Sequence, residues 1–316
     1  KIAQTRWAIM NLSREQVAQE ACLEVGIEYI TVPADGEFHP TKLLDSHKKG
    51  NGRIKLFSDL KGGVAFNWVT GQSQNFFTNR SNSLPVSEQD REKAKAEQKK
   101  RKAELITKQN KAASKAHILF TSADLAPPDH PYLLAKQIKP YLARQADWEK
   151  WVLDDADKWK KIIIKDALLI PIFNADGIIR NVQAIFPEIP PELERNKDFL
   201  PKAELSGLFG WIGEKTETVC ICEGFATGAT VHEETGWRVY LAFTATNLLS
   251  VAQTIRKRLP EAKIILCADN DTKTKGNPGL TKATEAAKAV DGLVAVPPIA
   301  GDFNDYAIYL GKQNDS

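Results

Sequence analysis

The chain has 316 residues, of which 42% are hydrophobic and 26% are charged, as is ordinary for a soluble globular protein. No apolar run approaches the roughly 20 residues of a membrane span, and no signal peptide opens the chain. We therefore expect a cytoplasmic protein with no membrane partner. The four cysteines include no Cys-x-x-Cys pair, which argues against a zinc ribbon. This length suffices for about two or three domains with cores of their own.

The net charge of +3 is distributed unevenly. Ten Lys/Arg and five Asp/Glu fall between Glu88 and Lys115, in a stretch without turn signals. A basic segment of this kind suits a polyanionic partner. It is equally typical of a solvated connector helix with alternating charges, and we favour that interpretation.

The first part of the chain predicts a capped helix and then a small sheet. Residues 12–26 have helical spacing of apolar positions, with Ser13 as N-cap and Gly26 as the residue after the helix. Residues 38–77 read as a β-meander, in which strands 53–57 and 64–69 are joined by a turn at Gly62-Gly63.

Alternation in the second of these strands places Phe66 and Trp68 on the same face. The two rings are expected either in the core of this small domain or, together with Arg53 and Lys55, on a surface that stacks nucleic-acid bases. We favour the core. Cys22, His39 and His47 are too scattered for a good metal site, so no zinc is expected.

The middle of the chain predicts a proline-rich turn, a helical segment and a hairpin. Pro127–Lys136 should start a short helix in which Tyr132 and Leu133 are anchors and His130 is not catalytic. A following helical segment should place three packing tryptophans on one side, namely Trp148, Trp151 and Trp159. Residues 167–173 and 178–186, with a turn at 174–177, predict a β-hairpin.

Acidic residues follow three short apolar runs in the last third of the chain. Residues 219–222 lead to Glu223-Gly224, residues 264–268 lead to Asp269-Asn270-Asp271, and residues 293–296 precede Gly301-Asp302-Phe303-Asn304-Asp305. The runs read as strands buried on both faces. Helical stretches alternate with them, among them one closed by Gly236 and one starting at Asn247 as N-cap. This pattern predicts a doubly wound α/β unit with a parallel sheet.

In such a sheet the functional site lies at the carboxyl ends of the strands, so Glu223, Asp269 and Asp271 should converge. Several carboxylates at one point need a compensating cation, and hard oxygen ligands without nearby His or Cys favour Mg²⁺ or Mn²⁺. Gly224 would let the backbone approach a phosphate or metal closely. The competing interpretation is that each carboxylate caps a helix or lies in a surface turn.

This ordered set of acidic motifs resembles the TOPRIM domain, which primases of the bacterial (DnaG-like) type share with topoisomerases and some nucleases. The ending Gly301-Asp302-Phe303-Asn304-Asp305 is similar to the signature of plasmid- and phage-encoded primases. The Trp-x-Thr-Gly after the glycine-rich hairpin and the His-Pro-Tyr-Leu segment followed by a lysine also occur in that group. The resemblance covers Pro127 to Asp305 well and Phe38 to Phe77 weakly.

The resemblance implies a domain order and an activity. A small β-rich module without zinc (residues 1–87) would stand in place of a primase template-binding domain, followed by a basic helical linker (88–116). An α+β primase subdomain (117–215) would precede the TOPRIM domain (216–316). The implied activity is that of a DNA primase, a nucleotidyltransferase of DNA replication that makes short primers on single-stranded DNA from nucleoside triphosphates.

The resemblance also implies roles for individual residues. Asp269 and Asp271 would be the principal ligands of a two-metal site, Glu223 a further ligand or general base, and Asp302 and Asp305 outer ligands. Nucleotide or template would be bound by glycine and polar or basic side chains, namely Arg180, Gln183, Lys197, Lys202, Gly224, Lys273 and Lys275.

Two other functions use the same residues. A TOPRIM-type nuclease would direct these carboxylates at a phosphodiester, and a degenerate primase-like module would bind nucleic acid without catalysis. A topoisomerase would need a strand-cleaving tyrosine, for which the six tyrosines give no support. A replicative helicase is a further candidate partner.

Overall fold

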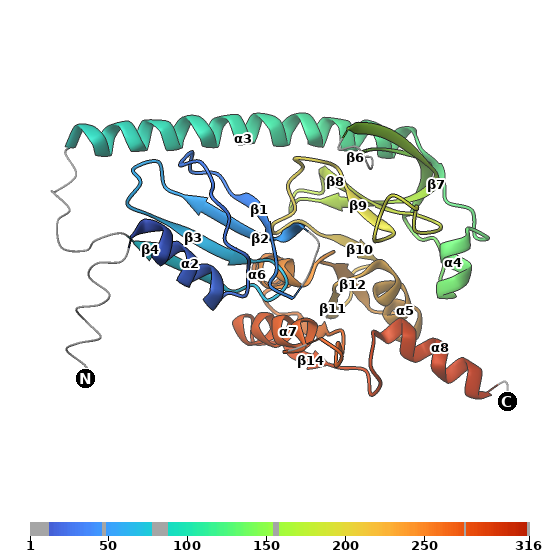
Figure 1. Cartoon of the computed structure of the whole chain (residues 1–316). Helices are drawn as coiled ribbons and strands as arrows, with labels where there is room; N and C mark the ends of the chain where they lie inside the picture. Colours follow the sequence, from blue (N-terminus) through green and yellow to red (C-terminus); the bar gives the residue numbers. More distant parts are fainter. Residues whose placement is uncertain (1–12, 46–48, 78–87, 154–157, 275, 315–316) are drawn as a thin grey trace. The chain divides into compact units, whose positions relative to one another are not determined.

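The computed structural model describes residues 13–45, 49–77, 88–153, 158–274 and 276–314 (Figure 1). The chain divides into two compact units, Lys1–Glu97 and Gln98–Ser316. Among the helices of the described residues, none combines the length and the apolar character needed to cross a membrane.

The first unit is a four-stranded antiparallel sheet with one helix packed on it. Helix α2 (Arg14–Glu24) begins with a capping box, in which the Ser13 hydroxyl accepts from the Gln16 amide and the Gln16 side chain accepts from the Ser13 amide. The strands follow in spatial order, β1 (His39–Lys42), β2 (Lys49–Leu56), β3 (Gly62–Asn67) and β4 (Ser73–Phe77). The predicted helix, its cap and the meander are confirmed.

Two predictions within this sheet are wrong. Gly62 and Gly63 open β3 rather than forming the turn before it. A Cβ on Gly62 would clash with the Phe76 carbonyl oxygen, and a Cβ on Gly63 with the Lys55 carbonyl oxygen. Phe66 and Trp68 are not core residues, since Trp68 is 53% exposed and Phe66 only half-buried. The face toward α2 is instead formed by their neighbours, among them Ala65.

The second unit begins with most of α3 (Glu88–Ser122), which continues beyond the predicted end near Lys115. It then forms an antiparallel sheet with the order β5-β6-β7-β8-β9 and a short helix α4 (Pro131–Lys136). The strands are β5 (Asp124–Leu125), β6 (Arg144–Leu153), β7 (Trp159–Phe173), β8 (Ile179–Ile185) and β9 (Lys197–Phe199). The predicted hairpin is confirmed as β7 and β8.

The tryptophan-rich segment is not helical. Trp148 and Trp151 lie on β6 and Trp159 starts β7. Because side chains alternate along a strand, residues three apart point to opposite faces. Trp148 is therefore buried, where its indole donates to Asp198 over 3.0 Å, while Trp151 and Trp159 are 61% and 68% exposed.

The C-terminal sheet of the second unit has the order β10-β12-β11-β13-β14. Four strands are parallel and β10 pairs antiparallel with β12 at the edge. The strands are β10 (Gly210–Ile212), β11 (Thr218–Cys222), β12 (Arg238–Leu241), β13 (Lys263–Cys267) and β14 (Leu293–Ala295). The predicted doubly wound unit is confirmed, although β10 and β12 were not recognised from the sequence.

Helices cover both faces of this sheet (Figure 1). Val251 and Ile255 of α6 (Leu248–Arg258) and Ala283 of α7 (Pro278–Ala289) pack on one face. On the other face lie α5 (Phe225–Thr235), ended by Gly236, and α8 (Phe303–Asn314). The core on this second face continues to Ile170 and Ile172 of β7, so the two sheets of the second unit share one hydrophobic core.

Asn247 starts α6 as predicted, but its side chain does not cap the helix. The buried amide donates to the carbonyl oxygens of Leu208 (3.0 Å) and Ala242 (2.9 Å) and accepts from the Gly207 amide (2.8 Å). Asn247 therefore joins the loop before β10 to the end of β12.

We expect Asn247→Ala to lower the free energy of unfolding by about 2 kcal/mol or more, because it leaves buried backbone groups without partners. Denaturant unfolding followed by circular dichroism would measure the change. Gln253→Ala, at an exposed position of the same helix, should change stability by less than about 0.5 kcal/mol. Equal effects of the two substitutions would contradict this role for Asn247.

Candidate active site

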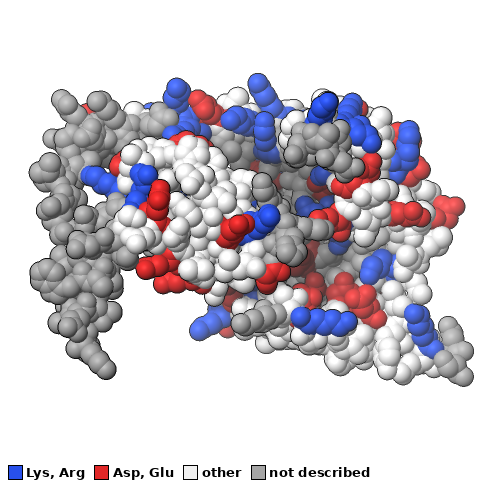
Figure 2. Space-filling model, in the orientation of Figure 1, with Lys and Arg blue, Asp and Glu red and all other residues white. Residues whose placement is uncertain are grey.

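Carboxylates from three separate loops meet at the carboxyl edge of the C-terminal sheet. Glu223 directly follows β11, while Asp269 and Asp271 follow β13. Glu223, Asp269, Asp271 and Asp302 lie close enough to act electrostatically on one another. Figure 2 shows acidic side chains gathered between α5 and α7. The structure thus brings together the residues that the sequence predicted would converge.

Burial and mutual repulsion shift the proton equilibria of two of these groups. Burial raises the pKa of Glu223 to about 7, against the opposing pull of Lys197. Burial also raises the pKa of Asp269 to about 7, and the charges of Glu223 and Asp302 add to this rise. Since each charge here makes the others harder to form, the site calls for a cation.

The donor atoms fit a hard divalent cation. The Oδ1 atom of Asp269 is buried and has no hydrogen-bond partner, which is costly unless another ligand satisfies it. All the converging donors are carboxylate oxygens, the type preferred by Mg²⁺ and Mn²⁺. Among the described residues, however, no three acidic, His or Cys side chains already stand at metal-binding distances from one another.

Asn270 fixes the loop between the two aspartates. Its backbone pairs with Gly301 in both directions (2.8 and 3.1 Å), and its side chain donates to the Ile299 carbonyl (3.1 Å). Asn277 donates to the Asn270 side chain (3.0 Å) and accepts from the Asp271 amide (2.9 Å). These contacts hold Asp269 and Asp271 against the loop that carries the third acidic cluster.

The third cluster is built as a reciprocal cap. The amide of Asp305 donates to Asp302 Oδ1 (2.9 Å), and the amide of Asp302 donates to Asp305 Oδ2 (3.2 Å). Asp302 also accepts from the Thr227 hydroxyl of α5 (2.8 Å). Gly301 has φ +113°, and a Cβ there would lie 2.5 Å from Asp305 Oδ2, so only glycine fits.

Helix α4 docks on this cluster. The Lys136 ammonium pairs with Asp305 (3.2 Å). The buried Asn304 side chain donates to the Lys136 carbonyl (2.7 Å) and to Thr230 of α5 (2.9 Å). His130 is an anchor rather than a reactive group, because its ring bonds the Asp166 carbonyl (2.7 Å) and the Tyr132 amide (3.1 Å). The His-Pro-Tyr-Leu segment thus positions the acidic site.

The residues predicted to bind nucleotide or template are not all at this site. Lys197, on β9, acts electrostatically on both Glu223 and Asp269. Gly224 begins α5 with φ −104°, so its backbone does not require glycine, but a Cβ there would lie 3.9 Å from Lys197 Nζ. The absence of a side chain leaves space between Lys197 and the helix start.

No contact with the converging carboxylates is found for the other residues predicted to bind nucleotide or template, as far as the structure describes them. Arg180 contacts Asn110 (3.0 Å) and Glu204 (3.6 Å), and Gln183 is buried with an unpaired Oε1. Lys202 and Lys273 are exposed, and Lys275 falls outside the described residues.

Sequence reasoning missed the neutral residues that position the carboxylates. Asn270 and Asn304 stand inside the acidic motifs and Thr227 follows Glu223-Gly224 by three residues, yet only their contacts reveal what they do. The one sequence signal for such a positioning role was Asn270, which stands between Asp269 and Asp271.

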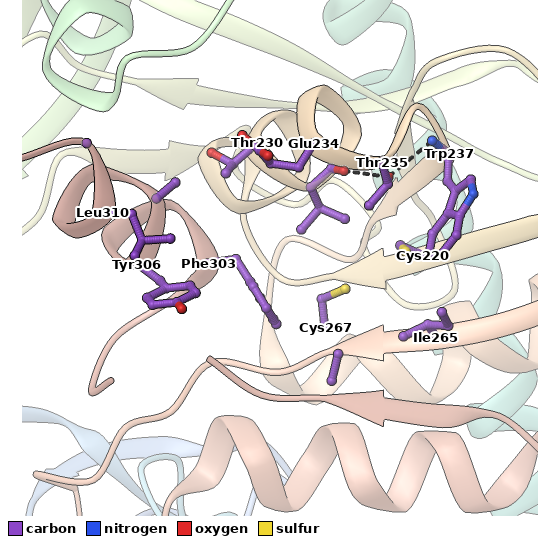
Figure 3. Close-up of a pocket in the computed structure, with 14 residues that line it drawn as sticks. Cys220, Thr230, Glu234, Thr235, Trp237, Ile265, Cys267, Phe303, Tyr306 and Leu310 are labelled. Carbon is purple, nitrogen blue, oxygen red and sulfur yellow. Dashed lines mark hydrogen bonds between the residues drawn. The ribbon is translucent and has the colours of Figure 1, made fainter. Parts of the chain in front are cut away.

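A separate pocket of about 610 Å³ opens between α5, α8 and the sheet (Figure 3). Its lining is mainly apolar, with Trp237 near one end and Phe303, Tyr306 and Leu310 from α8. It includes none of the converging carboxylates. We therefore assign the chemistry to the sheet edge and not to this pocket.

Known proteins are similar to this chain both at the site and over most of its length. Residues 218–313, which include the converging carboxylates, match the Toprim domain family. The chain is 28% identical over 285 residues to a DNA primase TraC of Escherichia coli, covering 86% of this chain and 18% of that protein. A second DNA primase TraC of Escherichia coli is 34% identical over 146 residues, 43% of this chain and 13% of that protein. The chain thus spans less than a fifth of these relatives.

Solved structures give weaker likenesses. The RNA polymerase domain of Mycobacterium tuberculosis primase DnaG has a TM-score of 0.43 at 16% identity, covering 67% of this chain and 81% of that chain. The DnaG primase catalytic domain bound to ssDNA has a TM-score of 0.45 at 11% identity, covering 66% and 77%. We base no assignment of site residues on these two structures.

The metal-free protein should lose stability as pH rises from about 4 to 7. Glu223 and Asp269 keep their protons to about pH 7 when folded, against ordinary values of 4.5 and 3.8, so between these limits the native state binds more protons than the unfolded state. The free energy of unfolding then falls with pH. We expect the melting temperature in EDTA to drop by roughly 5 °C over this range.

The control is Asp269→Asn, which removes one of the two groups and should flatten the decline. Melting curves of both proteins at several pH values, in EDTA, would provide the comparison. An identical pH slope for the two would contradict the assignment.

Proposed function

We propose that this Toprim-domain chain is a DNA primase that makes short primers on single-stranded DNA from nucleoside triphosphates in a metal-dependent reaction. The observation that carries the proposal is the convergence of Glu223, Asp269, Asp271 and Asp302, with Lys197 beside them, at one sheet edge. Similarity to DNA primase TraC over most of the chain supports it. We retain residues 1–87, 88–116, 117–215 and 216–316 as the proposed functional divisions.

The carboxylates at the sheet edge would bind the metal ions. Asp269 and Asp271 are the proposed principal ligands of Mg²⁺ or Mn²⁺, and Asp302 and Asp305 the outer ligands or orienting groups. Bound divalent ions would supply charge neutralisation at the reacting phosphates and activation of the 3′-hydroxyl. The orphaned Oδ1 of Asp269 supports the first assignment.

Glu223 is the proposed further ligand or general base. A carboxylate whose pKa stands near 7 is suited to exchange a proton at neutral pH, since the best general base has a pKa close to the working pH. The Ala245 amide donates to it and so limits the rise of its pKa.

The nucleotide triphosphate needs cations besides the metal. Lys197 reaches the space above Gly224 at the start of α5, where free backbone amides favour an anion. We propose this space as the triphosphate site. Contacts to nucleotide or template by Arg180, Gln183, Lys202, Lys273 and Lys275 remain secondary parts of the proposal, as does a replicative helicase as partner.

Asp269→Ala and Asp271→Ala should each lower primer synthesis by roughly 100-fold or more, because each removes a metal ligand. The measurement is incorporation of labelled nucleotides on single-stranded DNA with Mg²⁺ or Mn²⁺, beside the wild-type chain. Circular dichroism and melting curves would show that both variants fold, and Glu261→Ala, at an exposed position outside the site, is the control.

The alternative functions give different products. Shortening of the input DNA by the wild type would indicate a TOPRIM-type nuclease. Binding without any product, unchanged in Asp269→Ala, would indicate a non-catalytic primase-like module. Full synthesis by either aspartate variant would refute the site assignment.

Lys197 and Lys202 can be separated by one comparison. Lys197→Gln should raise KM for nucleotides at least about tenfold, because its ammonium faces the acidic site. Lys202→Gln should have a much smaller effect, since Lys202 lies exposed in the turn after β9 with φ +65°. Steady-state kinetics of both variants tests this, and equal effects would contradict the triphosphate site.

A further inference from the structure

The sheet of the first unit has two chemically different faces. Ile54, Leu56, Ala65 and Phe76 point toward α2 and form a core with it. The register of β2 with β3 and of β3 with β4 sets the opposite face, where the outward residues are Arg53, Lys55, Val64, Phe66, Ser73, Asn75 and Phe77. These outward strand positions hold two cations and no carboxylate.

Aromatic rings gather at one end of this outward face. The Phe66 ring lies 6.5 Å from the Phe38 ring and 4.9 Å from the Trp68 ring, the latter in an edge-to-face arrangement. The Lys55 ammonium lies 5.4 Å from the centre of the Phe38 ring. Phe38 is 47% and Trp68 53% exposed. We call Phe38, Phe66, Trp68 and Lys55 the aromatic platform.

A cluster of exposed aromatic rings on one face is typical of a binding surface. The chemistry of the platform identifies the partner as a polyanion with flat apolar groups. Unpaired bases stack on aromatic side chains, and a lysine beside the rings offsets a backbone phosphate. Arg53 adds positive charge to the same face, although its guanidinium is held by the carbonyls of Gly50 and Gly52.

We propose that the aromatic platform binds single-stranded DNA by base stacking, without any metal. The identification of the strand as DNA rests on the proposed primase function, whereas the binding itself does not depend on the carboxylate site. Duplex DNA, whose bases are already stacked, binds weakly to such a surface.

The test uses the whole chain in EDTA and a fluorescein-labelled oligothymidine of roughly 20 nucleotides, read by fluorescence anisotropy. Trp68→Ala and Phe66→Ala should each weaken binding by roughly tenfold, while Trp68→Phe keeps most of the affinity. Lys55→Gln should reduce the slope of log K against log salt by about 0.7, the contribution of one phosphate contact on a single strand.

Leu23→Ala is the matched control, because Leu23 is 62% exposed in the same unit but lies on α2. It should bind as the wild type does. Wild-type affinity in Trp68→Ala and Phe66→Ala, with circular dichroism showing that both fold, would overturn the proposal. So would an equal loss of duplex and single-strand binding.

The outcomes separate this proposal from the primase function. Asp271→Asn should keep single-strand binding in EDTA and lose synthesis. A wild-type chain that binds through the platform but makes no primer would leave the platform standing and refute the primase. Primer synthesis by the wild-type chain, together with unaltered single-strand binding in Trp68→Ala, would support the primase and refute the platform.

Discussion

Repulsion between carboxylates at one edge of the C-terminal sheet is the constraint on which the second unit depends. Glu223 and Asp269 are held where burial raises the pKa of each to about 7, so the fold pays a free-energy penalty to keep them together. Parallel strands β11 and β13 leave no alternative, because neighbouring parallel strands deliver their carboxyl ends to the same edge. Removing the penalty requires positive charge, which Lys197 supplies only in part.

The residues that hold this arrangement are mostly neutral. Asn270, Asn304 and Thr227 fix the acidic loops by hydrogen bonds that add no charge to the site. Lys136 is the exception, and it pairs with Asp305, which is more exposed than Asp269. Lys136 thus balances the charge of the exposed Asp305, whereas the charges of Glu223 and Asp269 are balanced only in part, by Lys197.

Sequence patterns predicted the parallel sheet and the meeting of its carboxylates because both follow from local rules. Buried strands are continuous apolar runs, and ligands lie at their carboxyl ends. What depends on distant partners could not be predicted. Asn247 looks like a helix cap by its position, yet its amide bonds the loop before β10, and the β12 run was missed between stronger signals. Trp148 and Trp151 showed a spacing compatible with a helix, but the pairing of β6 with β7 decided their conformation.

The first unit shows why alternation alone cannot assign a core. Phe66 and Trp68 share a face by period, and nothing in their own strand states whether that face is inner or outer. The decision belongs to α2, whose small residues Ala18 and Ala21 pack against the opposite face of the sheet. Small residues on a helix let a sheet approach closely, and Ala65 and Phe76 fill the side toward α2. Phe66 therefore lies on the other side of the sheet, outward with Lys55. An aromatic face that the helix leaves open is therefore a consequence of how this sheet is packed, and it is the surface that we propose for base stacking.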